Sequence, residues 1–207
     1  VQYFKEVEIV KAILDENRFT YHFQPIVNAK TGDIYAYEAL MRADVEQFIS
    51  PLTIIKYADY MGRLYDIEKL TFFNVLKHIR DNENLFDGKK VFINSIPDNR
   101  LQGYDADELT VELEKYSATV VVELTEQAEL PDAELTLMKK EYASMGIETA
   151  VDDYGTGYSN VTNLLRYMPN YVKIDRMLLS EIQDSPQKQH FVREIIEFAH
   201  DNNIKAL

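Results

Sequence analysis

Short apolar runs alternate with longer amphipathic stretches along most of this chain, and this alternation constrains its fold more than any other feature. The runs are rich in Val, Ile and Tyr and have the length of strands: Tyr21–Val27, Ile34–Leu40, Lys90–Ser95, Thr119–Leu124, Ile147–Asp152, Tyr171–Ile174 and Ile204–Leu207. Repeated strand and helix units are typical of a parallel sheet covered by helices. The sequence therefore predicts an α/β fold.

The link between the first two predicted strands is only six residues long, 28–33. Six turn-rich residues cannot hold a crossover helix, so we expect these two strands to form an antiparallel hairpin. Later strands are followed by stretches long enough for parallel pairing, and the order predicts a TIM-like (β/α)8 barrel with an antiparallel first strand. Because the sequence stops at Leu207, we expect the C-terminal strand and helix of such a barrel to be missing from this chain.

Several amphipathic stretches carry the marks of helices. Residues 1–19 predict a charged lead-in helix and lack the pattern of a signal peptide. Ser50 followed by Pro51 predicts the start of a helix that runs to about Gly62. Residues 64–80 predict a helix with one face on the sheet. Its apolar stripe consists of Leu64, Ile67, Leu70, Phe73, Leu76 and Ile79.

Composition limits the partners of the chain. At 207 residues the length favours one compact domain, residues 1–207. The 35 acidic against 22 basic residues give a net charge of −13, which disfavours polymeric nucleic acid and anionic membranes as partners. The absence of cysteine excludes thiolate metal sites and agrees with a cytoplasmic location. No apolar run reaches the ~18 residues of a transmembrane helix, so we expect no membrane contact by this segment.

Polar side chains gather at the carboxyl ends of the second to sixth predicted strands, the edge where barrel enzymes build their active sites. They are Glu38, Arg42, Asn94, Glu123, Asp152, Asp153, Lys173 and Asp175. Carboxylates brought together in this way repel one another unless cations lie between them. Oxygen ligands suit Mg²⁺ or Mn²⁺. Adjacent Asp152 and Asp153 suit a pair of ions about 3.5–4 Å apart, an arrangement that supports phosphodiester cleavage.

Some of these residues also fit a purely structural interpretation. Glu38 and Arg42, taken one at a time, are typical of solvated surface positions. Asn94 precedes Pro97 closely and fits a turn. Gln24 fits either a surface role or a ligand contact. Only their arrangement as a set favours a functional site.

The later strand ends present the same choice. Asp152 and Asp153 would suit a loop or a helix cap, and Lys173 could reach the surface or pair with Asp175. Glu123 differs, because it directly follows three valines of a predicted core strand. A carboxylate in that position is costly to bury unless it is paired or bound to a metal.

The ordered set resembles the EAL domain family. The matching motifs are Gln24-Pro25-Ile26, Glu38-Ala39-Leu40 with Arg42, Asn94, Glu123-Leu124-Thr125-Glu126, Asp152-Asp153-Tyr154-Gly155-Thr156-Gly157 and Lys173-Ile174-Asp175. They follow the family's order between about Thr20 and Leu207. Each motif alone is unspecific, but the ordered set at strand ends is highly specific. The resemblance implies a bacterial signal-transduction hydrolase, a phosphodiesterase that opens cyclic di-GMP to linear pGpG.

The resemblance also implies a role for each matching residue. Glu38, Asn94, Glu123 and Asp152 would hold one metal ion, and Asp152 and Asp153 would share in a second, with Mg²⁺ or Mn²⁺ as the cofactor. Lys173 would position or polarise the attacking water or a phosphate oxygen. Gln24, Leu40 and Arg42 would contact the substrate. Glu126 would steady the loop 154–160, a stretch linked in the family to dimer contacts.

One departure from the family pattern affects the expected activity. A glutamate that binds the second metal ends the family's seventh strand, and a glutamine follows on the eighth, but this sequence stops before both positions. We therefore expect this chain by itself not to be fully competent. A catalytically silent cyclic di-GMP receptor that signals to a partner domain is the alternative function, and a protein-interaction module is a third. The resemblance further implies a homodimer. It also implies a larger parent protein with fused sensory or GGDEF-type domains, and it is compatible with a membrane anchor elsewhere in that parent protein.

Overall fold

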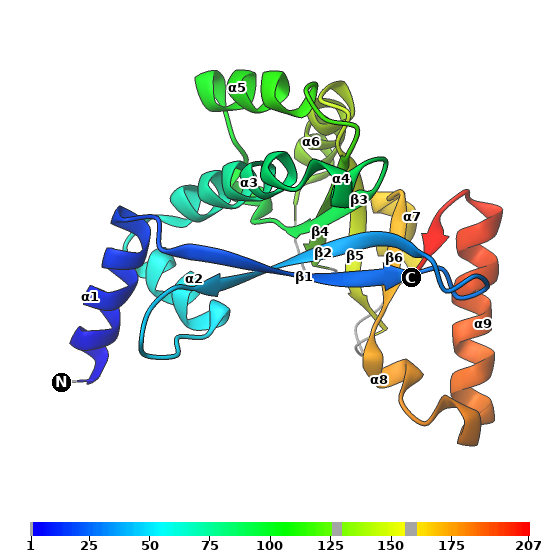
Figure 1. Ribbon diagram of the computed structural model, residues 1–207. Helices are drawn as coiled ribbons and strands as arrows, with labels where there is room; N and C mark the ends of the chain where they lie inside the picture. The colour runs from blue at the N-terminus through cyan, green and yellow to red at the C-terminus, as the bar shows by residue number, and fades with distance from the viewer. Residues whose placement is uncertain (1, 126–129, 156–160) are drawn as a thin grey trace. The chain divides into compact units, whose positions relative to one another are not determined.

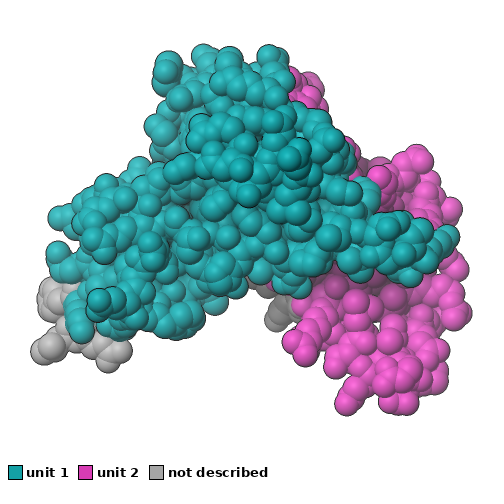
Figure 2. Space-filling view, viewed as in Figure 1, with its two compact units in different colours: residues 1–120 teal, residues 121–207 magenta. Residues whose placement is uncertain are grey.

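The computed structural model describes residues 2–125, 130–155 and 161–207. Its chain divides into two compact units, Val1–Val120 and Val121–Leu207 (Figures 1 and 2). Within the described residues, no helix combines the length and the apolar character needed to cross a bilayer. The grouping of both units into one domain stays a prediction.

The first unit is built on the predicted antiparallel hairpin. Strand β1 (Phe19–Val27) pairs with β2 (Ile34–Ala43), and the two run side by side as the long blue hairpin in Figure 1. The link closes through a bond of 2.8 Å from the Asn28 amide to the Asp33 carbonyl, and the Asn28 side chain accepts from the Lys30 amide. Such an Asx turn reverses the chain without a helix. The antiparallel first pair is therefore confirmed.

A parallel strand extends this hairpin. Strand β3 (Lys90–Asn94) pairs with β2 in parallel, with Glu38 beside Phe92. The helices of the unit are α1 (Gln2–Asp15), α2 (Pro51–Tyr60), α3 (Leu64–Asp81), α4 (Glu83–Phe86) and α5 (Gly103–Leu113), with a short 3₁₀ turn, η1 (Pro97–Asn99). Helix α2 begins as predicted, because Ser50 accepts a bond from the Thr53 amide and Pro51 occupies the first turn.

The predicted apolar stripe of α3 is only partly correct. Ile67, Leu76 and Ile79 are buried, but Phe72 and Val75 replace the other predicted members in the core. Leu64, Leu70 and Phe73 are half-buried. The buried face follows positions 68, 72, 75 and 79, one step round the helix from the predicted stripe. It packs on β1, where the Tyr21 hydroxyl bonds to Thr71 of α3 at 3.2 Å.

The second unit is a run of parallel strands. Strand β4 (Thr119–Thr125) begins at the end of the first unit, and β5 (Glu148–Tyr154), β6 (Tyr171–Ile174) and β7 (Lys205–Ala206) follow. Each of the last three pairs in parallel with its predecessor. The seven predicted strands are all present, and their ends either match the prediction or shift by up to three residues. The pairings confirm the α/β class with an antiparallel first strand pair.

The connections of the second unit are helical, as parallel pairing requires. They are α6 (Asp132–Ser144), α7 (Val161–Tyr167), α8 (Arg176–Leu179), the 3₁₀ turn η2 (Ile182–Asp184) and α9 (Pro186–Asp201). Gly146 adopts a φ of 73° just after α6, a left-handed conformation that ends helices at low cost for glycine. The helices return the chain, so the carboxyl ends of β4, β5 and β6 fall on one edge.

Candidate functional site

The predicted substrate-contacting residues share one face of the β1–β2 hairpin. Gln24 lies directly opposite Glu38, and opposite residues of an antiparallel pair point to the same side. Leu40 and Arg42 follow Glu38 at intervals of two along β2, so they occupy the same face. Gln24 is exposed, whereas the other three are half-buried. The hairpin thus groups on one face the predicted metal ligand Glu38 and the three residues that are predicted to contact the substrate.

Asn94 extends this face onto β3. Phe92 lies beside Glu38 in the parallel register, and Asn94 stands two residues further at the carboxyl end of the strand. The two-residue period places Asn94 on the side of the sheet that carries Glu38. Its side chain is exposed. In the first unit, therefore, one carboxylate and one carboxamide of the predicted metal set lie on one face of neighbouring strands.

In the second unit, Lys173 joins two of the predicted acidic residues. Its ammonium nitrogen lies 2.6 Å from Glu123 Oε1 and 3.1 Å from Asp152 Oδ1. The Glu123 side chain is fully buried, and those of Lys173 and Asp152 are 17% and 18% exposed. Burial of a carboxylate is costly without a partner, and the lysine supplies the compensating charge. The three residues come from β4, β6 and β5, in three adjacent strands.

A bulge in β5 brings the second aspartate to the same place. Val151 pairs with Val172 and Tyr154 with Ile174, so Asp152 and Asp153 together lie opposite the single residue Lys173. Asp153 has a φ of 54°, and its amide donates to Asp152 Oδ1 at 2.9 Å. A two-against-one bulge re-aims side chains and is common beside active sites. The left-handed backbone of Asp153 carries strain of a kind that gathers at functional positions.

Gly155 continues this turn and cannot be replaced by a larger residue without movement. Its φ is 115°, a region that only glycine enters readily. A Cβ atom at this position would lie 2.1 Å from Leu178 Cδ1. The glycine of the predicted Asp-Asp-Tyr-Gly motif is thus fixed by both backbone conformation and close packing.

The donors in the second unit fit a hard divalent cation. Glu123 and Asp152 each offer a carboxylate oxygen, and these oxygens lie within 4.8 Å of each other. Carboxylate oxygens at such spacing are ligands that Mg²⁺ and Mn²⁺ accept. The structural alternative for Lys173 was a pair with Asp175, whereas the ion pairs described above join its ammonium group to Glu123 and Asp152. Asp175 instead caps α8 by accepting a bond of 2.6 Å from the Met177 amide.

Two sequence predictions concern residues that the structure does not describe. Glu126, the expected support of the following loop, lies outside the described residues, as do 156–160 of that loop. Their proposed parts in the site and in dimer contacts therefore stay predictions.

A buried carboxylate near β3 was missed by the sequence reasoning. Glu68 of α3 is 1% exposed, and it accepts bonds from Ser95 Oγ at 2.5 Å and from the Ile96 amide at 2.8 Å. Burial raises its pKa from 4.5 to about 7, against the lowering effect of these two bonds. The available signal was its helical spacing with Phe72 and Val75, which places Glu68 on the buried face.

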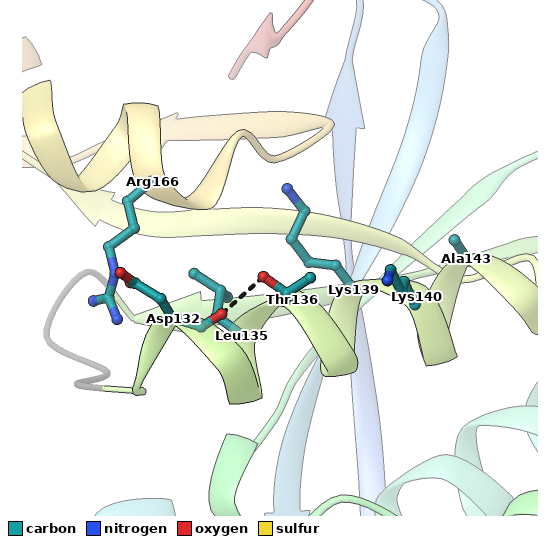
Figure 3. A pocket seen from close by; sticks show the side chains of 7 residues that line it. All are labelled: Asp132, Leu135, Thr136, Lys139, Lys140, Ala143 and Arg166. Atoms are coloured by element: carbon teal, nitrogen blue, oxygen red, sulfur yellow. Dashed lines mark hydrogen bonds and ion pairs between the residues drawn. The ribbon is translucent and has the colours of Figure 1, made fainter.

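A surface cavity of about 420 Å³ lies elsewhere in the second unit (Figure 3). It is lined by Asp132, Leu135, Thr136, Lys139, Lys140, Ala143 and Arg166. Arg166 reaches across from α7 to bond Asp132 at the start of α6. Burial lowers the pKa of Lys139. None of the predicted site residues lines this cavity, so it is separate from the cluster around Lys173.

An α/β fold whose parallel strands end in paired acidic residues and a half-buried lysine defines a class of strand-end, barrel-type site. The model of the EAL domain family matches residues 6–207, and the chain belongs to this family. Its fold is accordingly the TIM-like barrel of EAL domains. A solved structure described as PaMucR phosphodiesterase in a cyclic di-GMP complex superimposes with a TM-score of 0.80 at 23% identity, and covers 98% of this chain and 85% of that chain.

Two further similarities complete the comparison. The protein called cyclic di-GMP phosphodiesterase PdeR of Escherichia coli (strain K12) is 26% identical over 206 residues, 96% of this chain and 31% of its own length. This chain thus spans about a third of that relative. A manganese and cyclic di-GMP complex of Klebsiella pneumoniae BlrP1 has a TM-score of 0.77 at 20% identity, and covers 91% of this chain and 48% of that chain. At such identity the structural likeness concerns the fold.

Proposed function

We propose that this chain is the catalytic domain of a phosphodiesterase that hydrolyses cyclic di-GMP to linear pGpG with Mg²⁺ or Mn²⁺. The observation that carries the proposal is the arrangement of Asp152 and Asp153 opposite Lys173, with buried Glu123 paired to the same ammonium group. Relatives named as cyclic di-GMP phosphodiesterases and a manganese-containing neighbour support it.

The proposed ligand set follows the family motif. The motif assigns Glu38, Asn94, Glu123 and Asp152 to one divalent ion, and Asp152 and Asp153 to a share in a second. Bound there, the ions supply Lewis-acid chemistry, which activates water and neutralises charge on the phosphoryl oxygens. Gln24, Leu40 and Arg42 bind the substrate. An arginine suits this role because its planar guanidinium can donate two bonds to one phosphate.

Lys173 is proposed to orient the attacking water or a phosphate oxygen. Its ammonium group pairs with two carboxylates, and an ammonium group donates hydrogen bonds but accepts none. In the hydrolysis, the water oxygen forms a bond to phosphorus and the bond from phosphorus to the 3′ oxygen breaks. The 3′ oxygen takes up the proton that water loses. The product is the linear dinucleotide with a 5′ phosphate and a free 3′ hydroxyl.

The test compares variants of the full-length protein that contains this chain. Asp152→Asn should abolish pGpG formation, because it removes a negative charge from the residue that both proposed ions share, and a neutral amide oxygen attracts a divalent cation less strongly than a carboxylate. The control is Asp201→Asn, an exposed aspartate at the end of α9 that lies outside the proposed site. Tight binding of cyclic di-GMP by the wild type with no product would favour the receptor function. No binding at all would eliminate both.

Dimerisation and attached domains are part of the same proposal. The family resemblance and the short share of PdeR that this chain covers support a larger parent protein, with sensory or GGDEF-type domains. A relative from Pseudomonas aeruginosa, MucR, is named as a bifunctional diguanylate cyclase and cyclic di-GMP phosphodiesterase. The region that matches this chain makes up 30% of the length of MucR. Sedimentation of the full-length protein with and without cyclic di-GMP tests the expected homodimer.

A further inference from the structure

A single buried acid joins helix α3 to the chain that leaves β3. Glu68 is 1% exposed and shares the inner face of α3 with Phe72 and Val75. A carboxylate in such surroundings is costly to bury unless its oxygens are hydrogen-bonded. One oxygen accepts from Ser95 Oγ at 2.5 Å and the other from the Ile96 amide at 2.8 Å. Both donors belong to the two residues that directly follow Asn94.

These bonds fix the path of the chain at the end of β3. Asn94 is the last residue of the strand, and η1 begins at Pro97, so Ser95 and Ile96 are the entire connection. The Ile96 carbonyl accepts from the Asn99 amide at 2.8 Å within that turn. The backbone amide of Ile96 is therefore held on one side by α3 and its carbonyl on the other by η1. These bonds restrict the backbone of Asn94, the residue that precedes Ser95 and Ile96.

Helix α3 is itself anchored on the hairpin that carries Glu38. Tyr21 of β1 donates from its hydroxyl to Thr71 of α3, one turn from Glu68, at 3.2 Å. Its ring also meets His78 of α3 edge-on, with centroids 6.2 Å apart. The carboxylate of Glu68 thus reaches β3 from a helix that is packed on β1, and both strands flank β2.

A hydrophobic residue at position 68 would satisfy packing alone. The chain instead has a glutamate there, which accepts two hydrogen bonds from Ser95 and Ile96, just beyond the end of β3. A charge-bearing acceptor gives stronger and shorter hydrogen bonds than a neutral one. Groups that orient metal ligands in this indirect way are common in metal sites, where their loss lowers metal affinity by about 10–100-fold.

We propose that Glu68 is a positioning residue that holds the Ser95–Ile96 connection so that Asn94 presents its amide oxygen to the divalent ion. This inference rests on the proposed function, in which Asn94 is a metal ligand. Glu68 touches neither ion nor substrate, and it acts only through Asn94. Substitution of Glu68 should therefore weaken metal binding in the wild type but cause no further loss in a protein that already lacks Asn94.

The experiment is a double-mutant cycle in the full-length protein, with Mn²⁺ binding without nucleotide as the main readout. Glu68→Gln keeps the shape of the side chain, and its amide oxygen can still accept from the Ile96 amide. Its amide nitrogen can only donate, so the charge-assisted bond from Ser95 Oγ is lost and is at best replaced by a weaker neutral bond in which the hydroxyl accepts. We expect Glu68→Gln and Asn94→Ala each to weaken Mn²⁺ binding by about 10-fold. The double variant should bind as weakly as Asn94→Ala alone. Under turnover, kcat should fall about 10-fold while KM for cyclic di-GMP stays within about 2-fold.

Variants of Ser95 provide a second test should Glu68→Gln fold poorly. Ser95→Ala removes one donor to Glu68 and should weaken Mn²⁺ binding, whereas Ser95→Thr keeps the hydroxyl and should restore it. Glu8→Gln, at an exposed position of α1, is the matched control. Independent losses in the Glu68→Gln and Asn94→Ala pair, or unchanged Mn²⁺ affinity in folded Glu68→Gln, would overturn the inference. A wild type that binds Mn²⁺ but forms no pGpG would overturn the proposed catalysis. The double-mutant cycle could still be interpreted in that case, because it is measured by Mn²⁺ binding alone.

Discussion

The ammonium nitrogen of Lys173 lies 2.6 Å from the buried carboxylate of Glu123. The pair joins β4 and β6 across the intervening strand β5, and Asp152 of that strand contacts the same ammonium group at 3.1 Å. A cation held among acids at the carboxyl ends of parallel strands is both a stability element and the centre of the proposed chemistry.

Removal of this cation should expose the cost of the buried acid. We expect Lys173→Met to lower the free energy of unfolding by about 3 kcal/mol in metal-free buffer, because it removes the ammonium group that compensates the buried Glu123 carboxylate. Added Mn²⁺ should recover part of the loss. Urea unfolding with and without MnCl₂ measures both effects, with Lys140→Met at an exposed position of α6 as the control.

A second substitution separates charge from packing in the same pair. The double variant Glu123→Gln with Lys173→Met removes both charges, so it should be more stable than Lys173→Met alone. Equal stabilities of the single and double variants would mean that lost packing, and not an uncompensated carboxylate, causes the destabilisation.

Asp153 allows backbone strain to be separated from chemistry. Because its φ of 54° favours Gly, Asn and Asp, Asp153→Asn should keep the free energy of unfolding within about 0.5 kcal/mol. Asp153→Ala should cost about 1 kcal/mol through the unfavourable backbone. Both should reduce pGpG formation, since both remove a carboxylate from the proposed second ion. Full activity in Asp153→Asn would remove Asp153 from the ligand set.

Gly155 should prove intolerant of substitution for two separable reasons. A Cβ atom would lie 2.1 Å from Leu178 Cδ1, and the φ of 115° disfavours any side chain. We expect Gly155→Ala to destabilise the fold by about 1–3 kcal/mol. Leu178→Ala in the same protein should relieve the collision but not the backbone strain, so the recovery should be partial. Thermal unfolding of Gly155→Ala, of Leu178→Ala alone and of the double variant tests this, and complete recovery would show that φ contributes nothing.

Glu68 should give the protein a characteristic pH dependence. Its folded-state pKa of about 7 lies above the ordinary 4.5, so the folded protein binds this proton more tightly than the unfolded chain. Stability from this group is present below pH 4.5 and is lost as the pH rises through 7. The gap corresponds to about 3 kcal/mol. Tyr21, the nearby ionisable group on β1, has its pKa raised to about 12 and stays neutral throughout this window.

The measurement compares wild type with Glu68→Gln, which does not titrate. The difference between their free energies of unfolding should change by about 3 kcal/mol between pH 4.5 and 7, in the direction that favours Glu68→Gln at the higher pH. A difference that is flat over this range would show that Glu68 is charged in the folded protein at acidic pH, and the burial argument would fail.

The strands and most strand-end residues were predictable because both depend on local pattern. Apolar runs such as Val120–Val122 mark buried strands, and the residues that follow them must fall at the sheet edge. The hairpin of β1 and β2 was equally predictable, since a six-residue link excludes a crossover helix. These features need no knowledge of distant contacts.

The geometry that makes the cluster was not predictable in this way. Nothing in the letters Asp152-Asp153 indicates that a bulge sets both residues against Lys173, because the bulge depends on pairing with β6. Glu68 was overlooked because an acid on an apolar helix face reads as solvated until its partners after β3 are known. The stripe of α3 was placed one step off since Phe73 and Phe72 are equally apolar.

We propose that the domain hydrolyses cyclic di-GMP only when a divalent ion is bound. The most direct test of this proposal follows the nucleotide by chromatography while chelator-stripped full-length protein is incubated first without metal and then with Mn²⁺. We expect unchanged cyclic di-GMP in the first phase and its conversion to pGpG after Mn²⁺ is added. Bound but intact cyclic di-GMP in both phases, or pGpG formed before any metal is added, would contradict the proposal.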